Sequence, residues 1–420
     1  MALHFAAMTA KLKRPPKIAL AVAGGGPLGA IYEVGAMCAL EESLIGLDFN
    51  DLHHYVGVSA GGFIVAALAN GITPRSLCAS FIETTPGDAD AFDPSWLMQP
   101  AYLEYLQRSA KLPWLVGSAL WQLALGQKSM VNALEHLAPA LPTGLFTNQF
   151  IDTHLARLFN SPGRTNDFRQ LKAQLTLVAT HLDSAQAAPF GRPGWDHIPI
   201  SKAVQASAAL PGLFPPVEIE GQFYVDGALK KTMHASVALE AGVDLLICLN
   251  PLVPFNATAK GSGGIPHIVE GGLPAVLSQT FRSMIHSRME LGMKHYEHAY
   301  PGTDIVLIEP DHHDPELYLA NTFSYAQRRQ LAEHAYQQTR ELLRKDSTSL
   351  AKKLARHGVT LNHAALKDSD RHLIAHRAPA QAGDSRGMNA LPPTAVNSLH
   401  AALDRLDAWV DSRKPLPLRS

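Results

Sequence analysis

The sequence predicts an α/β fold in which a mostly parallel sheet lies between two layers of helices, three layers in all. Residues 17–23 (KIALAVA) form an apolar run that ends in three glycines, and apolar residues at helical spacing follow. The same unit repeats at residues 53–71, with a strand through Val56, a sharp turn about Ser59 and a helix that ends near Gly71. Successive strand–turn–helix units are typical of parallel sheets.

Further strands and helices follow the first two units. The strand candidates are short apolar runs at residues 174–183, 223–226, 243–251 and 303–310. The helix candidates lie at residues 201–209, 230–241, 275–300 and 323–345. These segments extend the sheet and its helical layers to about residue 345.

Residues 92–145 interrupt this alternation with a helical pattern that is rich in aromatic side chains, including Trp96, Trp114 and Trp121. Two interpretations stay open. The segment is either a helical subdomain packed on the sheet or a lid whose amphipathic rings contact a lipid interface.

The predicted organisation has three parts. Residues 1–16 form an N-terminal extension, residues 17–345 form the main α/β domain with its helical insertion, and residues 346–420 form a C-terminal appendage. Within the appendage, residues 378–395 have the Pro/Gly/Ala composition of a linker, and residues 398–410 have the pattern of a short amphipathic helix.

Composition and charge exclude several classes of protein. Of the 420 residues 46% are hydrophobic, so a large core can form, and 36 basic against 37 acidic residues leave no field that would recruit nucleic acid. No secretory signal pattern is present at the start, which makes a cytoplasmic location the default expectation. Cys38, Cys78 and Cys248 form no close pair in the sequence and are expected to be reduced core thiols.

The pentapeptide Gly57-Val58-Ser59-Ala60-Gly61 stands between a predicted strand and a predicted helix. A nucleophile on a sharp strand-to-helix turn needs neighbours without bulk, so that the backbone folds tightly and the hydroxyl stands exposed. The start of the helix adds a partial positive charge beside any anion formed there. Ser59 is therefore the candidate nucleophile, with Gly57 and Gly61 as the small residues of its turn.

The glycine-rich segment Gly24-Gly25-Gly26-Pro27-Leu28-Gly29 also joins a strand to a helix. Its backbone N–H groups can form an anion cradle for the oxyanion of an acyl-transfer reaction or for a pyrophosphate. The segment also matches the dinucleotide-binding pattern, with Asp48 at a suitable distance for a ribose contact. A nucleotide-binding regulatory module is therefore the alternative from another functional class, although Ser59 has no role in such a site.

Asp226 is the candidate base for Ser59. It ends an apolar strand and is followed by the small residues Gly227 and Ala228, which places it at the carboxyl edge of the sheet, where α/β proteins build their sites. Partial burial raises the proton affinity of a carboxylate enough for it to accept a serine proton. Taken alone, Asp-Gly favours a simple turn, and only the combination with the other motifs favours a base.

These three motifs in this order resemble the patatin-like phospholipase family. The segment Ala206-Ser-Ala-Ala-Leu-Pro-Gly-Leu-Phe-Pro-Pro216, which leads to Asp226, is also similar to that family, and the resemblance extends from about residue 17 to residue 345. It implies a lipid acyl hydrolase with a Ser-Asp dyad, in which Ser59 is the nucleophile and Asp226 the general base. It also implies an oxyanion hole formed by Gly24, Gly25, Gly26 and Gly29.

The chain departs from the family pattern after the glycines, where many relatives have a basic residue and this chain has Pro27 and Leu28. The backbone cradle is unaffected, but the basic side chain that would contact a phosphate head group is missing at these positions.

The 20 histidines leave room for a triad, yet most are expected to have surface or core roles. The Asp311–Asp314 run (Asp-His-His-Asp) points successive side chains in different directions, so no metal site is expected.

The function predicted from the sequence is hydrolysis of fatty acyl esters of phospholipids or lysophospholipids through an acyl-enzyme, without cofactor or metal. An acyltransferase or a triacylglycerol lipase with the same dyad is the alternative. The expected partner is a lipid substrate at a membrane surface, with peripheral association of a cytoplasmic protein. Neither nucleic acid nor an obligate protein partner is expected.

Overall fold

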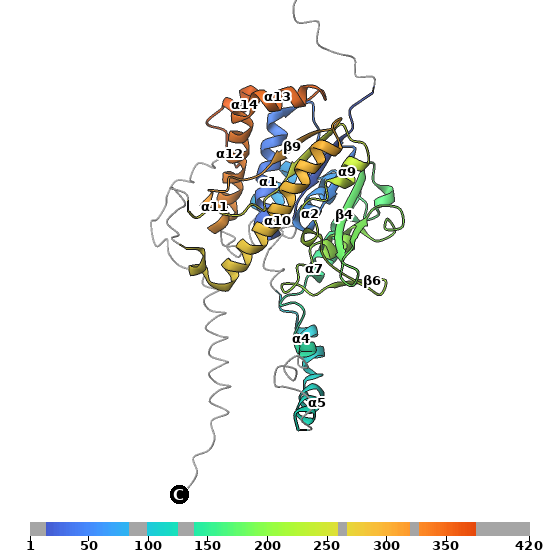
Figure 1. Cartoon of the computed structure of the whole chain (residues 1–420). Helices are drawn as coiled ribbons and strands as arrows, with labels where there is room; N and C mark the ends of the chain where they lie inside the picture. The colour runs from blue at the N-terminus through green and yellow to red at the C-terminus, as the bar shows by residue number, and fades with distance from the viewer. Residues whose placement is uncertain (1–13, 84–98, 125–137, 259–266, 320–326, 375–420) are drawn as a thin grey trace, which may run out of the picture. The chain divides into compact units, whose positions relative to one another are not determined.

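A sheet of eight strands forms the centre of the computed structural model, which describes residues 14–83, 99–124, 138–258, 267–319 and 327–374 (Figure 1). The order of the strands is β6-β7-β4-β3-β1-β8-β9, and β5 also pairs with β4. The run from β4 to β9 is parallel, whereas β5, β6 and β7 join it antiparallel. The strands are β1 (Ile18–Val22), β3 (His54–Gly57), β4 (Gln174–His181), β5 (Ala187–Phe190), β6 (Val217–Ile219), β7 (Gln222–Asp226), β8 (Leu245–Leu249) and β9 (Asp304–Ile308).

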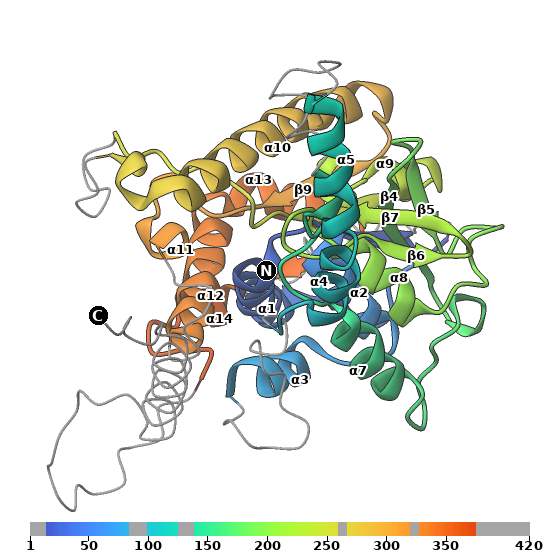
Figure 2. The same ribbon diagram turned by 90° about the horizontal axis from the view of Figure 1, so that it is seen from below.

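Helices cover both faces of this sheet, as Figure 2 shows from below. The larger layer contains α1 (Gly26–Ser43), α2 (Ser59–Ala69), α3 (Pro74–Cys78), α7 (Gln149–Phe159), α8 (Ile200–Ser207) and α12 (Arg328–Lys345). The opposite layer contains α9 (Ser236–Glu240) and α10 (Gly272–Ala299). The predicted three-layer α/β fold with a mostly parallel sheet is confirmed.

The alternation of side chains along β1 separates the two cores. Leu20 and Val22 belong to the core beneath the larger helical layer, whereas Ala19 and Ala21 belong to the core under α9 and α10. All residues of β1 are buried. A strand covered on both faces requires a continuous apolar run, which explains why residues 17–23 are recognisable from sequence alone.

The later strand predictions are confirmed, but one helix prediction is wrong at its start. The helix expected over residues 230–241 begins only at Ser236, because residues 230–235 form a turn in which His234 has a left-handed backbone (φ 46°). A residue with positive φ cannot continue a right-handed helix.

The compact unit extends beyond the residue at which the appendage was predicted to begin. Three elements after residue 345 pack on the body: α13 (Ser347–Ala355), β10 (Thr360–Leu361) and α14 (His363–Lys367). Strand β10 pairs antiparallel with β2 (Leu44–Ile45), and the unit ends at Ile374. The predicted linker and terminal helix, and most of the predicted N-terminal extension, lie outside the described residues.

The described residues of the aromatic insertion include two α-helices. They are α4 (Tyr102–Ser109) and α5 (Leu112–Ala124). Helix α4 buries none of its residues, and the Trp114 side chain on α5 is 74% exposed. The insertion therefore presents aromatic rings to solvent, whereas Trp96 lies outside the described residues. Among the described helices, none is both long enough and apolar enough to span a membrane.

The fold also brings together two cysteines that are far apart in the sequence. The buried thiols of Cys38 on α1 and Cys78 on α3 lie next to each other, and their mutual contact and burial raise the pKa of the Cys38 thiol well above its ordinary range. All three cysteines are free and buried, as expected.

Candidate active site

Ser59 stands on a strained turn between β3 and α2. Its backbone is left-handed (φ 54°), a conformation that non-glycine residues adopt rarely and that is held in place by its surroundings. The flanking glycines leave no room for larger residues: a Cβ at Gly61 would lie 2.3 Å from the Ala23 carbonyl oxygen, and one at Gly57 would lie 2.4 Å from Val65 Cγ2. The sequence pattern Gly-x-Ser-x-Gly thus follows from the close approach of this turn to β1 and to α2 itself.

The side chain of Ser207, on α8, fixes the backbone of this turn. Its Oγ accepts a hydrogen bond of 2.8 Å from the Ser59 amide and donates one of 2.6 Å to the Val178 carbonyl oxygen on β4. Ser207 is fully buried, so water cannot replace either bond. Ser207 lies in the segment 206–216 that resembles the family, but its role could not be predicted, because its partners lie 148 and 29 positions away.

Replacement of Ser207 by alanine is expected to lower the free energy of unfolding by about 2–3 kcal/mol and to reduce kcat. The substitution leaves a buried N–H and a buried C=O without partners, which costs about 1–3 kcal/mol, and it releases the strained turn. Ser201→Ala is the matched control, since Ser201 is a buried serine on the same helix whose Oγ bonds to Asp152 instead. Chemical denaturation and kcat measured on both variants test this, and an equal loss of kcat in the control would contradict a specific role for Ser207.

Asp226 ends β7 directly beside Ser59. Its carboxyl accepts a 2.8 Å hydrogen bond from the Ala228 amide, and the Ser59 side chain lies close enough to stabilise the charged form. The side chain of Asp226 is 2% exposed, and this burial, opposed by the Ala228 amide and by Ser59, raises the pKa of Asp226 to about 6. Gly227 follows because a Cβ there would lie 2.2 Å from the Val178 carbonyl oxygen.

The glycine turn after β1 borders the same hydroxyl. A Cβ at Gly24 would lie 2.8 Å from Ser59 Cβ, so only glycine allows the two segments to approach. Gly25 packs against Pro251, and Gly26 has a left-handed backbone (φ 61°) that begins α1. The amides of Gly24, Gly25 and Gly26 donate to no other group in the described part of the chain, and they stand at the positive end of α1.

The expected fourth member of this cradle is engaged elsewhere. The Gly29 N–H donates a 3.0 Å hydrogen bond to the Gly25 carbonyl oxygen within the first turn of α1. Gly29 therefore has a packing role, since its Cα faces Pro251, and its amide is not available to an oxyanion. The Ala60 amide at the start of α2 is an alternative donor that the sequence argument did not include, because the first amides of a helix have no intrahelical partner.

Ser59, Asp226 and the glycine turn line one cavity of about 610 Å³. Most of its other lining residues are apolar, including Phe63, Phe81, Phe146, Leu213, Phe214 and Ile285. A deep apolar pocket with a few convergent polar groups is the usual form of a small-molecule site. Asp48 does not line this cavity, and its carboxylate accepts a hydrogen bond from the Asn50 amide in its own turn.

Two histidines lie near the candidate dyad. His154 on α7 lines the cavity and stacks on Phe150, with ring centroids 5.2 Å apart. His234 is buried, with Nε2 3.3 Å from the Gly227 carbonyl oxygen, and burial lowers its pKa to about 4. His234 is therefore neutral at neutral pH and supports the loop of Asp226.

A family model described as patatin-like phospholipase matches residues 20–239, which is more than half of the chain. The chain belongs to the patatin-like phospholipase family, in agreement with the resemblance of its motifs.

Solved structures similar to this chain include VipD from Legionella pneumophila, with 17% identity and a TM-score of 0.37 over 79% of this chain and 67% of that one. Two structures of ExoU in complex with SpcU from Pseudomonas aeruginosa are also similar. The first has 16% identity and a TM-score of 0.27 over 67% of this chain and 53% of that one. The second has 19% identity and a TM-score of 0.25 over 82% of this chain and 61% of that one. This chain thus spans about half to two thirds of their length.

Proposed function

We propose that this protein hydrolyses fatty acyl esters of phospholipids or lysophospholipids through a Ser59–Asp226 dyad and an acyl-enzyme. The observation that carries the proposal is that Ser59, on its strained turn, and the buried Asp226 carboxyl lie next to each other in the lining of a large apolar cavity. Family membership supports lipid acyl esters as the substrate class.

The reaction follows from the positions of these groups. Asp226 accepts the Ser59 proton as Oγ attacks the ester carbonyl, and the glycine-turn amides donate to the oxyanion that develops. The proton then passes from Asp226 to the leaving alcohol, and the acyl group stays on Ser59. In the second half of the reaction, Asp226 accepts a proton from water and the hydroxide attacks the acyl-enzyme. The proton then passes from Asp226 to Ser59 Oγ as the fatty acid leaves.

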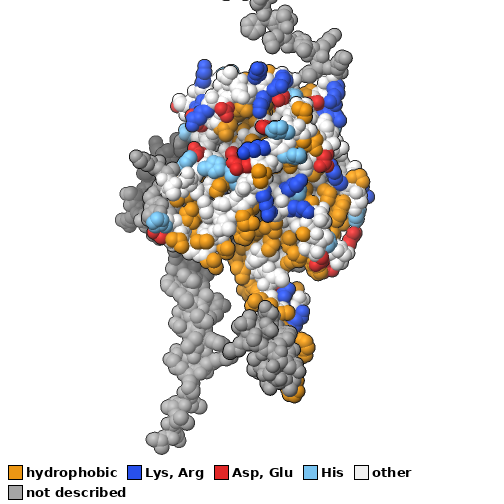
Figure 3. Space-filling model, viewed as in Figure 1, with side chains coloured by type: hydrophobic (Ala, Val, Ile, Leu, Met, Phe, Trp, Pro, Cys, Tyr) orange, Lys and Arg blue, Asp and Glu red, His pale blue; other side chains and the backbone are white. Residues whose placement is uncertain are grey.

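The surface at the mouth of the cavity favours a substrate held in a lipid phase. Leu210, Leu277 and Phe281 line the cavity and are also exposed. Figure 3 shows hydrophobic side chains gathered over the lower part of the face, where the N-terminal half of α10 lies, while charged side chains gather at the opposite end. Exposed rings on α4 and α5 extend the apolar surface. Peripheral contact with a membrane through these side chains would bring the acyl chain to the cavity.

The activity is expected to fall on the acid side with a midpoint near pH 6. Only ionised Asp226 accepts the Ser59 proton, and its pKa is raised to about 6 by burial. Below this value kcat/KM decreases about tenfold per pH unit, and above it kcat/KM is level. The profile is best measured with an uncharged short-chain ester, so that the substrate does not titrate. A midpoint near the ordinary aspartate value of 3.8 would contradict a buried carboxylate as the base.

A lipid panel tests the substrate class. Phospholipid, lysophospholipid and triacylglycerol vesicles or micelles are incubated with the protein, and released fatty acid is measured with and without an acceptor alcohol. Fatty acid from the first two supports the proposal, release from triacylglycerol alone indicates a lipase, and transfer to the alcohol indicates an acyltransferase. Binding of a dinucleotide without ester cleavage would instead indicate that the glycine turn is a nucleotide site. The close approach of Ser59 to Gly24 argues against that outcome.

A further inference from the structure

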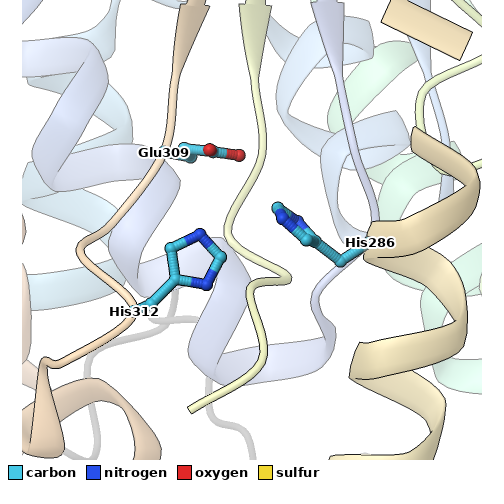
Figure 4. Close-up of side chains that lie close together, drawn as sticks. All are labelled: His286, Glu309 and His312. Atoms are coloured by element: carbon cyan, nitrogen blue, oxygen red, sulfur yellow. The ribbon is translucent and has the colours of Figure 1, made fainter. Parts of the chain in front are cut away.

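A second cluster of polar side chains lies beside the cavity and takes no part in the proposed reaction. His286 on α10, Glu309 after β9 and His312 in the following loop converge from two parts of the chain (Figure 4). One ligand atom from each lies within 4.8 Å of the others. None of the three lines the cavity of Ser59.

Each member of the cluster has a nitrogen or oxygen available to a cation. The Nδ1 of His312 lies 3.2 Å from the Pro254 carbonyl oxygen, which can only accept, so Nδ1 carries the proton and Nε2 keeps its lone pair. The His286 side chain is 6% exposed, its Nε2 faces Glu290 Oε1 at 3.6 Å, and its buried Nδ1 has no hydrogen-bond partner among the described residues. An orphaned buried nitrogen is costly unless something occupies it.

The surroundings of the cluster resemble the outer shell of a metal site. Histidine ligands commonly donate their second ring N–H to a carbonyl or carboxylate, and ligand carboxylates are themselves hydrogen bonded. Here Pro254 holds His312, Glu290 faces His286, and Asn250 Nδ2 lies 3.3 Å from Glu309 Oε2. Two imidazoles and one carboxylate are a typical donor set for Zn²⁺.

We propose that His286, Glu309 and His312 bind a divalent transition-metal cation, with Zn²⁺ the best match, as a structural site. The cation would link α10 to the loop after β9 and, through Asn250, to the loop after β8. That loop carries Pro251, against which Gly25 and Gly29 pack, and Leu252, which lines the cavity. The site thus stabilises the wall behind the glycine turn without contact with the ester.

The test is a Zn²⁺ titration of the chelator-treated full-length protein, followed by competition with a chromophoric chelator. His312→Ala and Glu309→Gln are expected to lose one equivalent of bound Zn²⁺ or to weaken that equivalent at least about tenfold. His313→Ala is the matched control, because His313 is an exposed neighbour that pairs with Asp311 instead. Saturating Zn²⁺ should also raise the Tm of the wild type and of the control, but not of Glu309→Gln, because ligands that bind only the folded state stabilise it.

The proposal would be overturned if the Zn²⁺ titrations of the wild type, His312→Ala and Glu309→Gln coincided. It would also be overturned if the wild type bound no Zn²⁺. Far-UV circular dichroism checks that the variants are folded, and His312→Gln, which is closer in size, replaces His312→Ala if that variant is not. Since the readout is bound metal and Tm rather than ester cleavage, failure here leaves the proposed hydrolase reaction untouched.

Discussion

Replacement of Ser59 by alanine is expected to reduce ester hydrolysis about 10³- to 10⁶-fold while the protein remains folded. The substitution removes the only oxygen that can form the acyl-enzyme in the proposed reaction, and losses of this size are typical when a nucleophile is deleted. Alanine accepts the same backbone path at about the same cost as serine, and the Ser59 amide keeps its bond to Ser207. Initial rates with a short-chain ester, together with a thermal unfolding curve, measure both effects.

A matched control sharpens this experiment. Ser201→Ala removes a buried hydroxyl from α8 and should retain activity within a small factor, because Ser201 contacts Asp152 and Asn166 rather than the turn. Activity of Ser59→Ala within tenfold of the wild type would exclude Ser59 as the nucleophile.

Replacement of Asp226 by asparagine is expected to lower kcat about 10²- to 10⁴-fold, since a neutral amide cannot accept the serine proton. Asparagine has the same shape, and its Oδ1 can still accept the Ala228 amide. The geometry of the turn is thus retained while the base is lost. A variant with wild-type kcat would show that another group, such as His154 on the cavity wall, takes the proton.

The same variant should be more stable than the wild type above pH 6. In the unfolded chain Asp226 ionises at its ordinary pKa of 3.8, whereas in the folded protein burial raises that pKa to about 6. Ionisation therefore favours the unfolded state, and the wild type loses stability as the pH rises from about 4 to 6; the loss then stays constant. The pKa difference corresponds to up to about 3 kcal/mol.

Denaturant unfolding of the wild type and Asp226→Asn at pH 4 and pH 7 measures this. The free energy of unfolding of Asp226→Asn should exceed that of the wild type at pH 7 and differ little from it at pH 4. A wild type that is the more stable protein at pH 7 would mean that the buried carboxylate is stabilised in the fold, contrary to the raised pKa.

Those parts of the site that depend on local geometry could be predicted from the sequence. Ser59 follows one parallel strand and the glycine turn follows its neighbour, so their carboxyl ends meet at one edge of the sheet. The small residues around Ser59 are recognisable because a close backbone approach excludes every larger side chain there. Asp226 was also identified, but the reason given for it does not hold: its strand β7 runs antiparallel to β4, and Asp226 reaches the site because it lies opposite Ala179 on β4.

Contacts between distant segments could not be predicted. Ser207 meets Ser59 across 148 positions, and although its segment resembles the family, nothing in that segment shows which residue it contacts. His312 and His313 have different partners, the Pro254 carbonyl oxygen and Asp311, and His312 meets His286 and Glu309 from outside the Asp-His-His-Asp run. The Gly29 amide was misjudged because a sequence pattern does not reveal which amides a helix has already used.

The most direct test of the proposed dyad is the site and rate of labelling by a fluorophosphonate, located by peptide mass spectrometry. The wild type should carry one adduct on Ser59, and Asp226→Asn should react much more slowly at the same residue, because the hydroxyl is no longer deprotonated as it attacks. An adduct on another residue, or labelling of Asp226→Asn at the wild-type rate, would contradict a Ser59 nucleophile activated by Asp226.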